Sequence, residues 1–196
     1  AGLHGHERNG VFGLARLASF LRSIAAGERE GARLLGRVLI VPAVNVLGLN
    51  IRSRAWPFDG TDLNRMFPGY DAGETTQRIA SAVLELTAAA AWRIDLHSSN
   101  VDFEELPQVR LYDPTDEERE AARWLGLPAV VERPANQTFR ATLASAWRAR
   151  GGRDPRACWG TASPPTARPW RAPTPSSAAR ATSCARQRAT PPAPAT

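Results

Sequence analysis

The feature that most limits what this chain can fold into is an abrupt loss of apolar residues after position 150. From Gly151 to Thr196 there is no Leu, Ile, Val, Phe, Met or Tyr, and Pro, Ala, Arg, Ser and Thr dominate. Such a segment cannot bury enough apolar surface to offset the entropy that is lost when it orders. We therefore expect a folded domain over residues 1–150 and a disordered Pro/Ala/Arg-rich tail over residues 151–196.

The tail follows directly after a segment that is predicted to be a helix, Thr138 to Arg150. The whole chain contains no Lys, which is typical of a GC-rich gene, and a wrong reading frame of such a gene would produce this composition. We therefore hypothesise a frameshift, or an equivalent error in the predicted gene, near Gly151, so that residues 151–196 are not native sequence. Translation of the DNA in its other two frames tests this, and a Leu/Val-rich continuation is the expected result.

Charge also divides the chain at this point. Residues 1–150 carry 18 Arg and 18 acidic residues and are neutral, whereas seven Arg against Asp154 alone place the whole formal charge of +6 in the tail. These Arg residues are not clustered, and only Trp159 and Trp170 accompany them. A basic tail that binds RNA or a membrane is therefore the weaker alternative, and we expect neither nucleic acid nor membrane as a partner.

The composition of the termini and the cysteine positions favour a cytoplasmic protein. The chain begins at Ala1, without an initiator Met and without a basic segment followed by an apolar one. No apolar run approaches the roughly 20 residues that are needed to span a bilayer. Cys158 and Cys184 both lie in the tail and define neither a disulfide framework nor a CxxC metal motif. A targeting signal on a missing N-terminal segment is the open alternative.

Helical and strand patterns alternate along the first 150 residues. Helices are predicted for residues 9–26, 74–91, 114–125 and 138–150. Strands are predicted for residues 38–41, 93–97, 108–112 and 129–131, the first and last of them as core strands. Residues 43–72 form a long connection that is rich in Asn, Gly, Pro and Arg, and we expect it to carry function. The alternation predicts an α/β domain whose site lies beyond the strand ends.

Two motifs, His4-Gly5-His6-Glu7 and Asp95-Leu96-His97, contain residue types that bind metal ions. A turn would bring His4 and Glu7 to the same side, and two imidazoles with a carboxylate can hold Zn²⁺ with one position left open for water. Either motif alone is weak evidence, because a histidine at a strand end usually forms ordinary hydrogen bonds. Asp95 shares a strand face with His97 and would either orient its imidazole or close the strand end. His6 is expected at the surface.

A third motif, Asp62-Leu63-Asn64-Arg65, lies between the other two. Its amide and guanidinium groups are donors of the kind that fix a substrate carboxylate. The alternative is a polar turn with a structural ion pair. Together with a metal site, a carboxylate clamp indicates a hydrolase that acts on acidic acyl-amino-acid or peptide-like substrates.

The order and spacing of these motifs resemble the succinylglutamate desuccinylase/aspartoacylase family, a branch of the zinc carboxypeptidase-like hydrolases. The matching pieces are residues 1–10, 41–45, 62–69 and 95–97. The resemblance implies a three-layer α/β/α domain with a mixed, mostly parallel sheet, here incomplete because the strand that should precede His4 is absent. It also implies that this sequence is truncated at its N-terminus and frame-shifted or divergent after about residue 150.

Carried over by motif, His4, Glu7 and His97 are the ligands of one Zn²⁺, and Asn64 and Arg65 hold the substrate carboxylate. Arg54 is the likeliest counterpart of the arginine that stabilises the oxyanion, with Arg52 as the alternative. The implied activity is zinc-dependent hydrolysis of an amide bond in an N-acyl amino acid or related acidic small molecule. The sequence does not indicate an oligomeric state.

The resemblance fails at the general base. The family's glutamate belongs to a Thr-x-Glu-x-Gly-like strand after a helix that resembles Thr138–Gly151, and Arg153–Gly160 occupies this place. No Glu follows Glu132, which precedes the helix, and Asp154 is the conceivable substitute. We therefore expect this chain to be catalytically impaired. The alternatives are a non-catalytic metal- or ligand-binding remnant and a carboxypeptidase-like peptidase.

Overall fold

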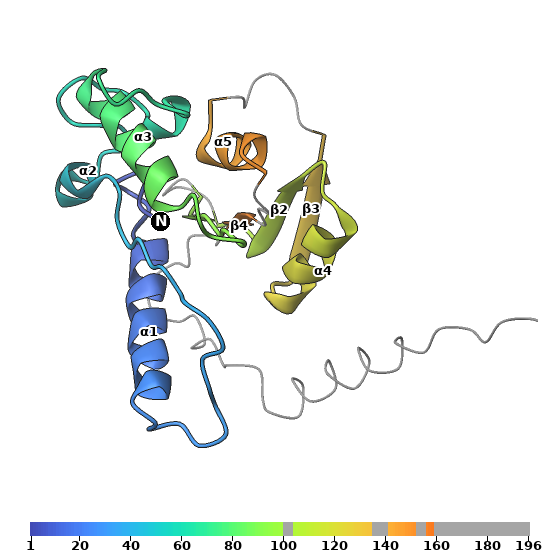
Figure 1. The fold of residues 1–196 in the computed structure, drawn as a ribbon. Coiled ribbons are helices and arrows are strands. Elements are labelled where there is room, and N and C mark those ends of the chain that lie inside the picture. Colours follow the sequence, from blue (N-terminus) through green and yellow to red (C-terminus); the bar gives the residue numbers. More distant parts are fainter. Residues whose placement is uncertain (100–103, 135–140, 152–155, 159–196) are drawn as a thin grey trace, which may run out of the picture. The chain divides into compact units, whose positions relative to one another are not determined.

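The computed structural model describes residues 1–99, 104–134, 141–151 and 156–158, all within one unit that spans Ala1–Ala162. The helices are α1 (Arg8–Ala25), α2 (Val46–Ile51), the short 3₁₀ helix η1 (Leu63–Arg65), α3 (Thr75–Leu86), α4 (Asp116–Trp124) and α5 (Leu143–Ala149). The strands are β1 (Leu96–His97), β2 (Gln108–Tyr112), β3 (Ala129–Arg133) and β4 (Arg156–Cys158). Figure 1 shows these elements along the chain. No helix among them is long and apolar enough to cross a membrane.

The four strands form one mixed sheet in the order β1-β4-β2-β3. β4 pairs with β1 in parallel and with β2 in antiparallel orientation, and β2 pairs with β3 in parallel. The predicted α/β class with a mixed, mostly parallel sheet is confirmed.

The predicted core strand at residues 38–41 is wrong. These residues are assigned to no strand, and the side chains of Val38 and Leu39 are 57% and 53% exposed. An apolar run becomes a strand only when another backbone pairs with it. Among the described residues, the recorded hydrogen bond to this backbone lies at its end, where the Ala1 amine donates to the Val41 carbonyl at 3.0 Å.

Two other strand predictions had wrong boundaries or burial. β1 contains two residues rather than 93–97, and the side chain of the buried Arg93 donates to the carbonyls of Thr87, Ala88 and Trp147 at the ends of α3 and α5. β3 is longer than predicted but lies at the sheet edge, and Val130 on it is 40% exposed, so it is not a core strand. β2 agrees with the prediction at both ends.

Assignment of the tail to disorder is wrong for Arg156–Cys158, which form β4 between β1 and β2. A strand that is paired on both sides can satisfy its backbone groups without an apolar side-chain pattern, and that pattern was the signal used for the prediction. The rest of the predicted disordered tail beyond Gly151 lies outside the described residues.

All four predicted helices are present, with shifted ends. α1 differs from its prediction by one residue at each end. α4 begins after Pro114, because Thr115 and Glu118 form a capping box. α5 begins at Leu143 rather than residue 138, with Thr142 as its cap, and α3 ends at Leu86 rather than residue 91. The connection 43–72 contains α2 and η1, which the sequence pattern did not reveal.

Two apolar clusters form the core. The larger one lies beneath the polar motifs and contains Leu3, Trp56, Leu63, Phe67, Ala80, Val83, Leu84, Leu143, Ala146 and Trp147. The smaller one belongs to α4 and the sheet and contains Val109, Leu111 and Ala122. Because Leu3 and Leu63 each directly precede a polar motif residue, their burial fixes the backbone from which His4 and Asn64 project.

Candidate metal centre

His4 and Glu7 are held together by a tight turn just before α1. The Glu7 amide donates to the His4 carbonyl at 3.1 Å, and both side chains are almost fully buried. Gly5 is required in this turn, because a Cβ there would overlap the backbone of Gly48 in α2. Direct packing of the turn against α2 therefore sets its position.

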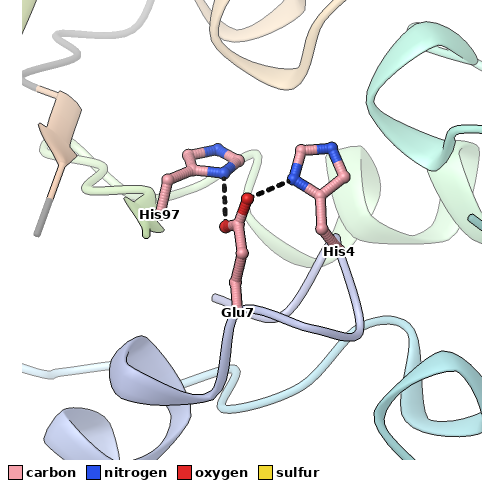
Figure 2. Close-up of side chains that lie close together, drawn as sticks. All are labelled: His4, Glu7 and His97. Atoms are coloured by element: carbon pink, nitrogen blue, oxygen red, sulfur yellow. Dashed lines mark hydrogen bonds and ion pairs between the residues drawn. The ribbon is translucent and has the colours of Figure 1, made fainter. Parts of the chain in front are cut away.

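His97 completes a three-residue cluster from the end of β1. His4 Nδ1 lies 2.6 Å from one carboxylate oxygen of Glu7, and His97 Nδ1 lies 2.9 Å from the other. Figure 2 shows the Glu7 carboxylate between the two imidazole rings. Potential ligand atoms of the three residues all lie within 4.8 Å of one another. The structure thus brings together the three residues that were predicted as metal ligands.

Each imidazole has a second carboxylate on its outer nitrogen. His4 Nε2 lies 3.0 Å from Asp62 Oδ1, and His97 Nε2 lies 2.7 Å from Asp95 Oδ2. These contacts orient both rings with Nδ1 toward Glu7. Asp95 thus contacts His97, which is the orienting contact that was considered for it. The contact between Asp62 and His4 was not predicted, and their separation of 58 residues gave no local signal for it.

Charge and burial act against each other in this cluster. Burial opposes ionisation of Glu7, but hydrogen bonds from His4 and His97 overcome this effect and lower the pKa of Glu7 to about 2. Burial likewise disfavours the charged form of His97, yet Asp95 and Glu7 raise its pKa to about 10. The pKa of His4 is also raised, because hydrogen bonds with Asp62 and Glu7 outweigh its burial. In the structure, positive imidazolium charge balances the buried carboxylates.

The donor set fits a divalent metal ion. Two imidazole nitrogens and one carboxylate, with the remaining ring nitrogens hydrogen-bonded to carboxylates, are typical of zinc sites that leave a coordination position open. A bound cation would replace the hydrogen bonds between Glu7 and the two imidazoles, and it would itself supply the positive charge that balances the carboxylate.

The residues predicted to bind substrate differ in burial and in their hydrogen-bond partners. Asn64 is buried, and its side-chain oxygen accepts a hydrogen bond from the Leu143 amide at 2.9 Å, while its NH₂ group is the part that could donate to a ligand carboxylate. Arg65 is exposed and donates to the Asn64 carbonyl at 2.8 Å. Arg54 donates to Asp62 at 3.0 Å and is thereby linked to His4. Arg52 is the left-handed cap of α2, and both Arg52 and Arg54 are exposed.

Two further residues lie beside the ligands. His6, which was expected at the surface, is partly exposed, and its ring lies 6.0 Å from the His4 ring in a stacked arrangement. The Ser98 amide donates to Glu7 at 3.1 Å and helps to keep that carboxylate ionised. The Ser98 hydroxyl is buried without a partner among the described residues.

Of the two acids weighed for the missing general base, Glu132 is described by the structure and is not one of the residues of this cluster. Glu132 lies on β3, where it forms an ion pair with Arg119 at 3.0 Å. Asp154 lies outside the described residues.

Similarity to known proteins extends over most of the described chain. The family description "Succinylglutamate desuccinylase/Aspartoacylase catalytic domain" matches residues 1–150. N-alpha-acetyl-L-2,4-diaminobutyric acid deacetylase from Halomonas elongata is 32% identical over 136 residues, which cover 66% of this chain and 37% of that protein.

Solved structures agree with this match. The product-bound ectoine utilization protein EutE (DoeB) from Ruegeria pomeroyi is 25% identical, with a TM-score of 0.69 over 84% of this chain and 49% of that one. An aspartoacylase family protein from Mesorhizobium loti is 27% identical, with a TM-score of 0.68 over 81% of this chain and 50% of that one. The chain spans half or less of the length of these relatives. The matched family description and the order of the motifs lead to one assignment: this chain belongs to the succinylglutamate desuccinylase/aspartoacylase family.

Proposed function

We propose that this chain represents a zinc-dependent hydrolase that cleaves the amide bond of an N-acyl amino acid or a related acidic small molecule. The observation that carries the proposal is the convergence of His4, Glu7 and His97, with both Nδ1 atoms directed at the carboxylate. The deacetylase relative from Halomonas elongata supports an acyl-amino-acid substrate. The predicted ligands of the zinc ion are these three side chains.

Each group of residues at the site has a proposed role in the reaction. Zinc bound by the three ligands would supply Lewis-acid chemistry, namely activation of water and polarisation of the scissile carbonyl. Arg54 would stabilise negative charge that develops on the carbonyl oxygen. The NH₂ group of Asn64 and the exposed guanidinium of Arg65 would bind the substrate carboxylate. The Ser98 amide holds Glu7 in its ionised form.

We further propose that this 196-residue chain turns over such substrates slowly or not at all. β4 lies beside β1, and Cys158 is the register partner of His97. Arg156–Cys158, the described part of the segment that should carry the family's glutamate, thus belongs to the strand that pairs with the strand of His97, and it contains no acid. General acid–base catalysis is typically worth about 10²–10⁴-fold, and amide cleavage needs a proton on its leaving amine.

The experiment compares three proteins: this chain, a chimaera in which the corresponding segment of the Halomonas elongata relative replaces residues 151–196, and the same chimaera with Gln in place of the family's glutamate. Zinc content and amine release from N-acetyl and N-succinyl amino acids are measured. We expect about one zinc per chain in all three proteins and hydrolysis only by the chimaera with Glu. Rapid turnover by the unaltered chain would contradict the proposed impairment. Absence of zinc from all three, while circular dichroism shows them folded, would contradict zinc dependence.

Two alternatives are decided by the same assay. A carboxypeptidase-like peptidase is compatible with Asn64 and Arg65, because a peptide C-terminus also presents a carboxylate, and it would cleave short peptides faster than N-acyl amino acids. A non-catalytic binding remnant would retain zinc and substrate affinity, and the Glu-containing chimaera would still be inactive.

The role of Arg65 in substrate binding can be tested in the active chimaera. Because a carboxylate clamp acts mainly in ground-state binding, Arg65→Ala should raise KM more than it lowers kcat. The loss of one charge-assisted contact should cost roughly 1.5–3 kcal/mol. A change in kcat alone would place Arg65 on the reacting carbonyl and reverse its roles with Arg54.

A further inference from the structure

We infer that Leu143, the first residue of α5, is a positioning residue whose backbone amide makes Asn64 present its NH₂ group, and not its carbonyl oxygen, to a ligand carboxylate. The inference rests on the proposed function for its chemical meaning. The hydrogen bond that carries it belongs to the structure without metal or ligand and can be tested separately.

One hydrogen bond fixes which way the side-chain amide of Asn64 faces. Its Oδ1 accepts from the Leu143 amide at 2.9 Å in a buried contact, although the two residues are 79 positions apart in the sequence. The oxygen and the NH₂ group lie on opposite branches of a side-chain amide, so a held oxygen directs both donors away from Leu143. A rotated side chain would set its NH₂ group against the Leu143 N–H and leave that buried donor unpaired.

The NH₂ group of Asn64 is available to a ligand. Within the described part of the chain it has no recorded hydrogen-bond partner, and the buried side-chain atoms there that lack a partner belong to His6, Ser98 and Arg110. The NH₂ group therefore keeps contact with solvent. A carbonyl oxygen in the same place would repel a carboxylate, because both groups only accept hydrogen bonds.

α5, shown in orange in Figure 1, is anchored at both ends, so the Leu143 amide has a fixed position. Near its beginning, the Phe67 amide donates to the Ala141 carbonyl at 3.2 Å. Near its end, Trp147 Nε1 donates to Thr87 Oγ1 at 2.8 Å. Between these contacts, α5 contributes side chains to the larger apolar cluster. Asn64 is thus oriented by an element that cannot easily shift.

The same bond also serves α5 itself. The first amides of a helix have no partner within the helix, and Asn64 Oδ1 supplies one for Leu143. A cap that stabilises α5 without any effect on ligands is therefore the alternative role of this bond.

The test compares Leu143→Pro with Leu143→Ala in the full chain. Both variants lose the same buried leucine side chain, but only proline lacks the amide hydrogen. The first position of a helix accepts proline, and Thr142 before it is extended, with φ −93° and ψ 157°, which suits a residue that precedes proline. The two variants therefore differ mainly in the donor to Asn64.

The probe is N-acetylglycine, and its control is N-acetylglycinamide, which lacks the carboxylate. Dissociation constants are measured by NMR titration without zinc, so that neither probe can bind through a metal ion. The freed side-chain amide in Leu143→Pro should be inverted for part of the time. We therefore expect Leu143→Pro to bind N-acetylglycine about 3–10-fold more weakly than Leu143→Ala does, with a smaller difference for N-acetylglycinamide.

The outcomes separate the inference from the proposed function. Equal binding of the two probes by the unaltered chain would contradict the carboxylate clamp of the proposed function, and the inference would fail with it. If the unaltered chain prefers N-acetylglycine but the two Leu143 variants bind it equally, the clamp stands and the inference alone is overturned. Equal losses for both probes in Leu143→Pro also overturn it, because they would show general damage to the fold.

A second readout needs neither variant nor ligand. In the chain labelled with ¹³C and ¹⁵N, the hydrogen bond should give a scalar coupling between the Leu143 amide nitrogen and the Asn64 side-chain carbonyl carbon. The bond from the Ala146 amide to the Thr142 carbonyl, at 3.0 Å within the same helix, is the internal control. Detection of the control coupling without the coupling to Asn64 overturns the inference.

Asn64→Asp provides an independent variant if both Leu143 variants unfold. Its carboxylate can still accept from the Leu143 amide, so α5 keeps its cap, but a second oxygen takes the place of the NH₂ group. We expect this variant to lose the preference for N-acetylglycine over N-acetylglycinamide. An unchanged preference would show that the group facing the ligand is not the NH₂ group, and would overturn the inference.

Discussion

The region around the candidate metal centre and the region formed by α4, β2 and β3 both contain pairs of acidic and basic side chains, but the pairs differ in burial. The side chains of His4 and Glu7 are 5% and 4% exposed, whereas those of Arg119 and Glu132 are 35% and 45% exposed. Buried pairs interact strongly and keep a defined geometry, while exposed pairs are screened by water and contribute little to stability. Buried charges thus organise a candidate site in the first region, whereas the Arg119–Glu132 pair of the second region lies at the surface.

The region with the buried charges also has the larger cluster of buried apolar residues. The cluster beneath the metal centre contains ten buried residues drawn from the N-terminal segment through α5, whereas the cluster beneath α4 contains three. Desolvated charges need a rigid surrounding, because a small shift of one ligand breaks several contacts at once. The larger core lies where the polar cluster requires it.

The largest expected effect concerns the metal ligands themselves. His97→Ala should lower zinc affinity by more than about 100-fold, since a ligand must matter at least as much as its hydrogen-bonded partners, whose loss costs about 10–100-fold. His6→Ala is the matched control, because His6 stacks near His4 but is not part of the three-residue cluster. Zinc content after dialysis provides the measurement. If His97→Ala retains zinc as well as His6→Ala does, His97 is not a ligand. The buried charges of this region would then not form the proposed metal site that distinguishes it from the region of α4.

A smaller effect should follow from weakening the larger core. Leu84 on α3 is 1% exposed, and Leu84→Ala should lower the free energy of unfolding by about 2–5 kcal/mol. Leu86 on the same helix is 55% exposed, and Leu86→Ala should change it by less than about 0.5 kcal/mol. Urea unfolding followed by circular dichroism measures both. Equal effects of the two variants would mean that the larger cluster does not support the site region.

The smallest effects should lie in the region of α4. Arg148 contacts Glu118, whose side chain is 4% exposed, so Arg148→Ala should cost about 1–2 kcal/mol by removing a partner of a buried acid. Arg119→Ala removes the exposed contacts with Glu132 and should leave the melting temperature unchanged within error. A larger loss for Arg119→Ala than for Arg148→Ala would show that burial does not rank these pairs.

The convergence of His4, Glu7 and His97 could be predicted because the motifs that carry them are local. The spacing of His4 and Glu7 and the strand end at His97 could be recognised from a few residues each, and the motif order supplied their association. The bond from Asp62 to His4 could not be predicted in this way, since it depends on how the chain folds back over 58 residues.

The errors in the strand predictions have one physical origin. An apolar run at residues 38–41 was interpreted as a strand and is not one, whereas Arg156–Cys158 lacks such a run and forms β4. A strand forms when its backbone makes hydrogen bonds with a neighbouring strand. The sequence of the segment itself does not show which other segment will be that neighbour. Helices hydrogen-bond internally, and all four that were predicted are present, with boundary errors where caps such as Thr142 decide the first residue.

The contact between Gly5 and Gly48 has a consequence for anyone who wishes to vary this protein. The turn that carries His4 and Glu7 touches α2 backbone to backbone, so no side chain lies between them that could be trimmed or rotated to accept a change. A mutagenesis library directed at the metal centre should therefore keep position 5 constant and place its diversity at His6, which is partly exposed. Where the turn contacts α2, the substitutions that can be tolerated are limited by main-chain geometry and not by the chemistry of the ligands.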